Sequence, residues 1–317
     1  MAVSIADIQK LRKMTGAGLS DCKKALTETE GNFDKAVEII REKGQAIAAK
    51  RSDRETSNGC VLVKYADNFG AIVALKCETD FVANGADYIK LTQDILDAAV
   101  AAKAKSLDEV KELTLADGTK VLDAVVARSG ITGEKMELDG YNFIEGENIS
   151  TYDHMGKHTL CTMVQTNKAA EEQAHAIAMQ VAAMKPMFLD EASVSQEFIE
   201  EEKKVAAEKT KQELVQKAVD AALKKAGINP AHVDSEEHME SNMGKGWITA
   251  EDVAKAKEII ATVSAEKAAN LPAQMIENIV KGRINRIYKE NCLLNQEFIQ
   301  DSKLSVADYL KAADKDL

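Results

Sequence analysis

The spacing of apolar residues changes at Gly59, and this change is the strongest constraint on how the 317-residue chain can fold. Before Gly59, apolar side chains recur every three or four residues, as on one face of a helix. After it, residues 60–65 and 71–77 are short runs rich in β-branched and other apolar residues, separated by turn-forming residues at 67–70. From about residue 195 the helical spacing returns within long charged stretches. The sequence therefore predicts a multidomain α+β protein.

Residues 1–45 are predicted to form a small domain of three helices. The glycines at 16–18 separate the first two helices, Ser20 is expected to cap the second, and Gly44 is expected to end the third. A domain of this length buries only a marginal core, so we expect it to function attached to a larger body. Residues 46–58 are polar and basic and are interpreted as a linker.

The strand-rich region contains the same arrangement of elements twice, a hairpin followed by a helix. The two hairpin turns share the pattern D-x-[F/M]-G, at 67–70 and 153–156, and each is followed about ten residues later by Thr-Asp or Thr-Asn. We interpret this as an internal duplication, although two unrelated hairpin–helix units could share these features. The first core subdomain is placed at 59–143, and the second at 144–194 together with 271–317.

A charged helical hairpin is predicted at residues 195–270, inserted into the second subdomain. The first helix of this hairpin carries a narrow stripe of apolar side chains along one face, and it is expected to end at Gly227 and Pro230. The polar segment 234–246 is interpreted as the connection to a second helix at 249–269. Charged flanks around a narrow apolar seam are typical of an antiparallel coiled coil, which would project from the core.

Composition and charge exclude several functions. Acidic side chains outnumber basic ones by 52 to 41, for a net charge of −11, whereas nucleic-acid binding depends on clustered Lys and Arg. No apolar run approaches the ~20 residues of a membrane span, and no signal-peptide pattern opens the chain, so we expect a cytoplasmic protein with no membrane contact. The five cysteines are odd in number and lack C-x-x-C spacing, which argues against disulfides or a zinc site.

The sequence contains no recognisable catalytic or cofactor-binding constellation. Residues 130–135 hold two glycines and a lysine but lack the spacing of a phosphate-binding loop. His154 and His158 flank a turn without a third ligand, so surface histidines are favoured over a metal site. Cys22 precedes two lysines, yet a cysteine on a buried helix face explains it more simply than a reactive thiol. We expect no enzyme activity, no metal and no cofactor.

The sequence Thr-Asp-Phe-Val at 79–82 follows an apolar strand and directly precedes a helix. In this position Asp80 and Phe81 would lie exposed at the tip of the strand-to-helix junction. From these residues alone, however, a structural interpretation is favoured: Thr79 or Asp80 caps the helix, while Phe81 and Val82 pack beneath it.

Two segments resemble the signatures of the bacterial elongation factor Ts family. Residues 11–26 match the family's amino-terminal signature throughout. Residues 77–83 are close to its central signature, although Ala74 and Lys76 depart from the usual Glu and Asn. Shorter likenesses follow in the family's order at 176–186 and 279–283.

The resemblance implies a guanine nucleotide exchange factor that promotes GDP release from elongation factor Tu. It also implies an amino-terminal domain similar to ubiquitin-associated three-helix modules, and a junction that approaches the partner's magnesium-binding region. A homodimer or a two-to-two complex is left open, as is direct contact of Asp80 with the metal. The implied contact residues are Thr79, Asp80, Phe81 and Val82 at the junction, Arg12, Leu19, Ser20 and Lys23 in the amino-terminal helices, and His154 in the second hairpin.

The chain departs from the family's usual pattern in two places. The insert at about 196–270 is longer than in many members, and the sequence stops at 311–317, where members usually continue into another strand; either the sequence is truncated or that edge is closed differently. Two alternatives stand beside the exchange factor. A scaffold that binds helices or ubiquitin-like proteins would leave nucleotide release unchanged, and an enzyme with Cys22 as its nucleophile would show selective alkylation of that thiol.

Overall fold

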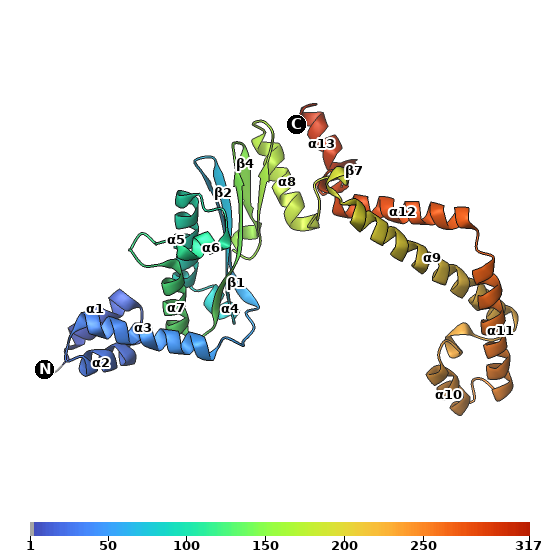
Figure 1. Cartoon of the computed structure of the whole chain (residues 1–317), viewed down its shortest axis with the longest axis horizontal. Coiled ribbons are helices and arrows are strands. Elements are labelled where there is room, and N and C mark those ends of the chain that lie inside the picture. Colours follow the sequence, from blue (N-terminus) through green and yellow to red (C-terminus); the bar gives the residue numbers. More distant parts are fainter. Residues whose placement is uncertain (1–2) are drawn as a thin grey trace. The chain divides into compact units, whose positions relative to one another are not determined.

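The computed structural model describes residues 3–317, which divide into two compact units (Figure 1). The first contains the described residues up to Lys185 together with Asp308–Leu317, and the second contains Pro186–Ala307. Both combine helices with small antiparallel sheets. The predicted α+β class is therefore confirmed.

The amino-terminal module consists of three helices, α1 (Ile5–Thr15), α2 (Leu19–Glu28) and α3 (Phe33–Lys50). Helix α1 begins with a capping box between Ser4 and Asp7. Gly18, and not Ser20, is the N-cap of α2, so the predicted capping role of Ser20 is wrong and its side chain is exposed in the first turn. Cys22 is fully buried in the module's core, where its Sγ lies 3.7 Å from the carbonyl oxygen of Ala17. A buried thiol of this kind does not meet a substrate.

The prediction that Gly44 ends the third helix is also wrong, because α3 continues to Lys50. Gly44 lies where α3 crosses α7 (Val121–Thr132), and the glycine that faces it is Gly130. A Cβ atom built on Gly130 would overlap the Cα of Gly44. The glycines therefore allow two helix backbones to approach closely, a packing role that sequence spacing does not distinguish from a helix stop.

The first hairpin forms as predicted and carries the core of this unit. Strands β1 (Asn58–Ala66) and β2 (Phe69–Cys77) are joined by a two-residue turn at Asp67 and Asn68, which both have positive φ, as this turn type requires. A strand that the spacing did not predict, β3 (Met136–Glu145), pairs antiparallel with β2 and completes the order β1-β2-β3.

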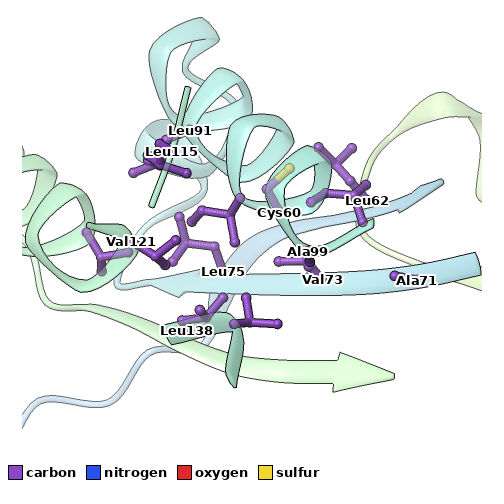
Figure 2. Packing of buried hydrophobic residues seen from close by; sticks show 14 of the residues in the cluster. Cys60, Leu62, Ala71, Val73, Leu75, Leu91, Ala99, Leu115, Val121 and Leu138 are labelled. Atoms are coloured by element: carbon purple, nitrogen blue, oxygen red, sulfur yellow. The ribbon is translucent and has the colours of Figure 1, made fainter. Parts of the chain in front are cut away.

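Alternate residues of β2 are buried under helices that follow it in the chain. After the short α4 (Asp80–Ala83), helix α5 (Ala86–Ala102) packs on β1 and β2, and α6 (Leu107–Glu112) and α7 complete the cover. Figure 2 shows the buried side chains between the sheet and these helices. Each fully buried Val, Leu, Ile or Phe side chain among them contributes about 1.5–3 kcal/mol. The strand end that leads into α4 is therefore held by a well-packed core.

The second hairpin and its helix are also present. Strands β4 (Ile149–Asp153) and β5 (Cys161–Gln165) form a two-stranded sheet, followed by α8 (Glu171–Met184), and the short 3-10 helix η1 (His154–Gly156) lies between the strands. The amide of Val61 donates to the carbonyl oxygen of His158 at 2.7 Å, which links β1 to the second hairpin.

The second unit is mainly helical. Helix α9 (Gln196–Lys225) packs along α11 (Ala250–Ala269) and α12 (Ala273–Asn291). The segment interpreted as a polar connection contains a helix, α10 (Glu236–Gly244), whose Met239 is buried in the cluster between α9 and α11. The remaining elements are the 3-10 helices η2 (Glu191–Ser193), η3 (Pro230–His232) and η4 (Leu293–Asn295), the hairpin β6 (Glu297–Phe298) and β7 (Asp301–Ser305), and α13 (Val306–Ala313), which begins at the end of this unit and continues into the first. Across residues 3–317, no helix combines the length and the apolar character needed to cross a bilayer.

The crossing of α3 and α7 predicts different responses to alanine at its two glycines. Gly130→Ala should lower the free energy of unfolding by about 1–3 kcal/mol, the usual effect of overpacking, because its new methyl group meets helix backbone. Gly44→Ala is the matched control, since its Cβ would meet nothing closer than the carbonyl oxygen of Val126 at 3.4 Å. Urea unfolding followed by circular dichroism measures both. Equal stability of the two variants would contradict the close crossing.

Candidate partner-binding site

The chain changes direction sharply between β2 and α5, and α4 occupies this corner. Thr79 is the N-cap of α4, and its side chain accepts a hydrogen bond from the amide of Val82 at 3.3 Å. At the other end, the side-chain amide of Asn84 donates to the carbonyl oxygen of Asp80 at 2.8 Å. The corner is thus closed by local bonds at both ends.

The side chain of Phe81 points away from the protein. It is 87% exposed, more than any other large apolar side chain in the described residues. Its neighbours Val82 and Ala83 turn inward and pack against the core. The capping role considered for Thr79 is observed, but the alternative that Phe81 packs beneath the helix is wrong.

The carboxylate of Asp80 is exposed beside this ring and has no hydrogen-bond or ion-pair partner among residues 3–317. An open hollow adjoins both side chains and is also lined by Asn84, Arg128 and Thr132. The guanidinium of Arg128 pairs with Asp87 at 3.3 Å. A ring, an unpaired carboxylate and a hollow therefore lie together on the surface at this corner.

Two glutamates hold the backbone behind the corner. The carboxylate of Glu134 accepts the Thr79 hydroxyl at 2.6 Å and the amides of Thr79 and Glu78 at 3.1 and 3.2 Å. In return, the carboxylate of Glu78 accepts the amide of Lys135 at 2.7 Å. Sequence reasoning assigned no role to either residue. Glu78 lies within the segment 77–83 that resembles the family's central signature, and Glu134 lies within 130–135, which was considered only as a possible phosphate-binding loop.

Glu78 is also the partner of two arginines from the segment after α3. Arg51 donates to it at 3.0 and 3.2 Å and Arg54 at 3.1 Å, and the Glu78 side chain is only 13% exposed. The pKa of Glu78 is held below its ordinary range, first by the bond from the Lys135 amide and then by Arg51 and Arg54. This carboxylate ties the corner to the chain that leaves the amino-terminal module.

The predicted residues of the amino-terminal module are all exposed. Arg12 lies on α1, and Leu19, Ser20 and Lys23 lie in the first turns of α2. Leu19 is an exposed apolar side chain, and Arg12 and Lys23 each carry a positive charge.

His154 is half-buried in η1, and its ring nitrogen Nδ1 lies 2.9 Å from the hydroxyl of Tyr152. His158 instead pairs through Nδ1 with Asp153 at 2.5 Å. The two histidines thus have different partners. Within the described part of the chain, no three His, Cys, Asp or Glu side chains are grouped so that they could hold a metal ion.

Comparison with known proteins identifies the family. The sequence model described as "Elongation factor TS" matches residues 78–230 and 216–317. Elongation factor Ts of Bacteroides fragilis is 68% identical over 318 residues, which cover 100% of this chain and 96% of the relative. The chain belongs to the elongation factor Ts family. The factors of Bacteroides thetaiotaomicron and Porphyromonas gingivalis are 66% and 42% identical, again over 100% of this chain and over 96% and 95% of theirs.

The resemblance described from the sequence is therefore confirmed. The matched residues of the elongation factor Ts model begin at Glu78 and so include the corner at 79–82. The amino-terminal module lies outside that match but within the full-length similarity to the relatives. Both candidate surfaces thus belong to the part of the chain that is shared with elongation factor Ts proteins.

The bonds of Glu78 predict a pH-dependent stability. Because its pKa is lowered in the folded protein, these bonds stabilise the fold above the ordinary glutamate pKa of about 4.3, and the stabilisation is lost as the pH falls toward the folded value. Glu78→Gln should therefore be less stable than the parent at neutral pH, and the difference should shrink below about pH 4. Urea unfolding at a series of pH values measures this difference.

The control for this experiment is Glu112→Gln, whose carboxylate reaches only Lys120, at 3.6 Å, from the surface of α6. It should follow the parent across the series. A constant difference between Glu78→Gln and the parent at every pH would contradict the assigned bonds.

Proposed function

We propose that this chain is a guanine nucleotide exchange factor for elongation factor Tu, and that the corner at residues 79–82 opens the partner's nucleotide site. Membership in the elongation factor Ts family supports the role in translation elongation and the partner. The observation that carries the residue assignment is the exposure of Phe81, a large apolar ring held in water by a rigid corner.

Exchange requires binding energy that differs between two states of the partner. A GTPase holds GDP mainly through backbone amides at its phosphates and through a bridging magnesium ion. A factor that binds the loosened state more tightly than the GDP-bound state shifts the equilibrium toward release, about tenfold for each 1.4 kcal/mol of difference. Equal affinity for both states would leave GDP where it is.

Phe81 supplies such a difference. Burying a phenylalanine side chain contributes about 1.5–3 kcal/mol, and this gain exists only where a receptive crevice has opened. Asp80 adds a carboxylate with no partner in its own chain's described residues, which can compete for hydrogen bonds around the partner's metal ligands. The chain's part in the reaction is to move groups of another protein, without making or breaking a covalent bond.

The remaining predicted residues anchor the complex in this proposal. Arg12, Leu19, Ser20 and Lys23 present an exposed surface on α1 and α2, and His154 is assigned a further contact in the second hairpin. Contacts of this kind bind both states of the partner and set the affinity. The corner then adds binding free energy that favours the state of the partner from which GDP is released.

Replacing Phe81 tests the proposal directly. Phe81→Ala should slow the release of fluorescently labelled GDP from elongation factor Tu by more than about tenfold, because the burial gain of the ring is lost. Its own stability should be unchanged, since the ring makes little contact with its own chain. Stopped-flow fluorescence measures the release, and Leu122→Ala, which removes another exposed apolar side chain from the same unit, is the control. An unchanged release rate for Phe81→Ala would refute the proposal.

Asp80 is expected to contribute separately from the ring. Asp80→Ala should slow release less than the double variant that also carries Phe81→Ala, because the carboxylate and the ring act on different groups of the partner. The same stopped-flow assay on the parent, both single variants and the double variant completes the cycle. A double variant no slower than Asp80→Ala alone would show that the two side chains have no separate contributions.

A further inference from the structure

We infer that Glu134 is a positioning residue that fixes the direction of Phe81 and Asp80 relative to the amino-terminal module. The inference deepens the proposed function and rests on it. Glu134 lies in the turn after α7, 55 residues from Thr79 in sequence, yet three donors at the base of the corner converge on its carboxylate. Two of them are backbone amides, so the bonds fix the path of the chain itself.

The backbone of Glu134 is fixed by the end of α7. Gly133 ends α7 with a left-handed conformation at φ 73°, which turns the chain so that Glu134 faces the end of β2. The buried Ser129 of α7 donates its hydroxyl to the carbonyl oxygen of Glu134 at 2.5 Å. The end of α7 therefore sets the position of the Glu134 backbone, from which the carboxylate extends.

The bonds run in both directions between the two segments. Glu134 accepts from the amides of Glu78 and Thr79, while Glu78 accepts from the amide of Lys135. Charge-assisted bonds of this type are about twice as strong as those between neutral groups. The paired segments 78–79 and 134–135 thus form one clamp across the base of the corner.

Helix α7 connects this clamp to the amino-terminal module. Its Gly130 is in backbone contact with Gly44 of α3, and its Asp123 pairs with Arg41 at 2.6 Å. Ile131 lies against the first interhelical turn of the module, where a Cβ atom on Gly16 would be 3.2 Å from its side chain. One helix therefore carries the module on its side and the clamp at its end.

This arrangement predicts a particular kinetic defect. Without the Glu134 carboxylate, the exposed surface on α1 and α2 is intact and still binds the partner, but the corner is no longer held at a fixed angle to it. The maximal rate of GDP release should then fall, while the concentration of factor needed for half-maximal rate should change little. A general loss of folding would instead lower the amount of active protein, and it would not lower the maximal rate selectively.

The experiment measures GDP release from elongation factor Tu over a range of factor concentrations. Glu134→Ala should lower the maximal rate about tenfold or more, the size expected for losing charge-assisted bonds to a positioned group, with a half-saturating concentration within about twofold of the parent. The isosteric Glu134→Gln should recover much of the rate, because its amide oxygen still accepts the two backbone amides. Glu112→Ala, at an exposed carboxylate on α6, is the matched control and should behave as the parent.

A triple variant separates this inference from the proposed function. If Glu134 acts through the corner, adding Glu134→Ala to the variant that carries both Asp80→Ala and Phe81→Ala should slow release by less than about twofold further. If Phe81→Ala slows release but Glu134→Ala slows it equally in the parent and in that double variant, the positioning role is overturned and the function stands. If Phe81→Ala leaves release unchanged, the proposed function is overturned.

Hydrogen exchange gives a readout that does not depend on the partner. In Glu134→Ala the amides of Glu78 and Thr79 should exchange faster than in the parent by about tenfold or more, while the amides of α1 and α2 should be unchanged. Unchanged protection at Glu78 and Thr79 would overturn the inference. Loss of protection throughout the module would also overturn it, because the residue would then support the fold as a whole.

Discussion

A helix of four residues cannot hold itself in a fixed direction, and this constraint governs the corner that carries Phe81. Forming one helical turn fixes several backbone angles for a single hydrogen bond, so isolated short helices are unstable. The fixed position of α4 must therefore come from outside it. The Thr79 cap, the packing of Val82 and Ala83 and the Glu78–Glu134 clamp supply this support. The outward ring depends on these bonds more than on any contact of its own.

The two hairpins differ in what they expose. In the first, the strand end leads into a clamped corner with an exposed aromatic ring. At the second, Tyr152 of β4 pairs with His154 and Met155 is exposed in the turn between the strands. The first sheet also contains β3, which comes directly after residues 134–135 and so brings them to the end of β2. The clamp at the first corner thus depends on a strand that has no counterpart in the two-stranded sheet of the second hairpin.

Local patterns predicted the elements of this site but not its long-range bonds. Runs of β-branched and other apolar residues around a turn correctly indicated β1 and β2, and the Thr79 cap follows from its position before a helix. By contrast, Glu134 is 55 residues from Thr79 and bonds mainly to backbone amides, which have no side-chain signature. Gly44 was misread because glycine suits both a helix end and a close helix crossing, and only the partner glycine at 130 decides between them. Helix α10 was missed because its short polar sequence carries few core residues.

In the proposed mechanism, the clamp matters for exchange because disorder would offset the gain from the ring. Fixing one residue's backbone costs roughly 1–2 kcal/mol of conformational entropy. If residues 79–82 were mobile in the free protein, ordering them on binding would cost about as much as, or more than, the 1.5–3 kcal/mol that burial of Phe81 contributes. When Glu134 and Glu78 already order these residues in the folded protein, the entropy is lost during folding and not during binding. In the proposed mechanism, more of the burial energy of the ring is then available as a preference for the opened state of the partner.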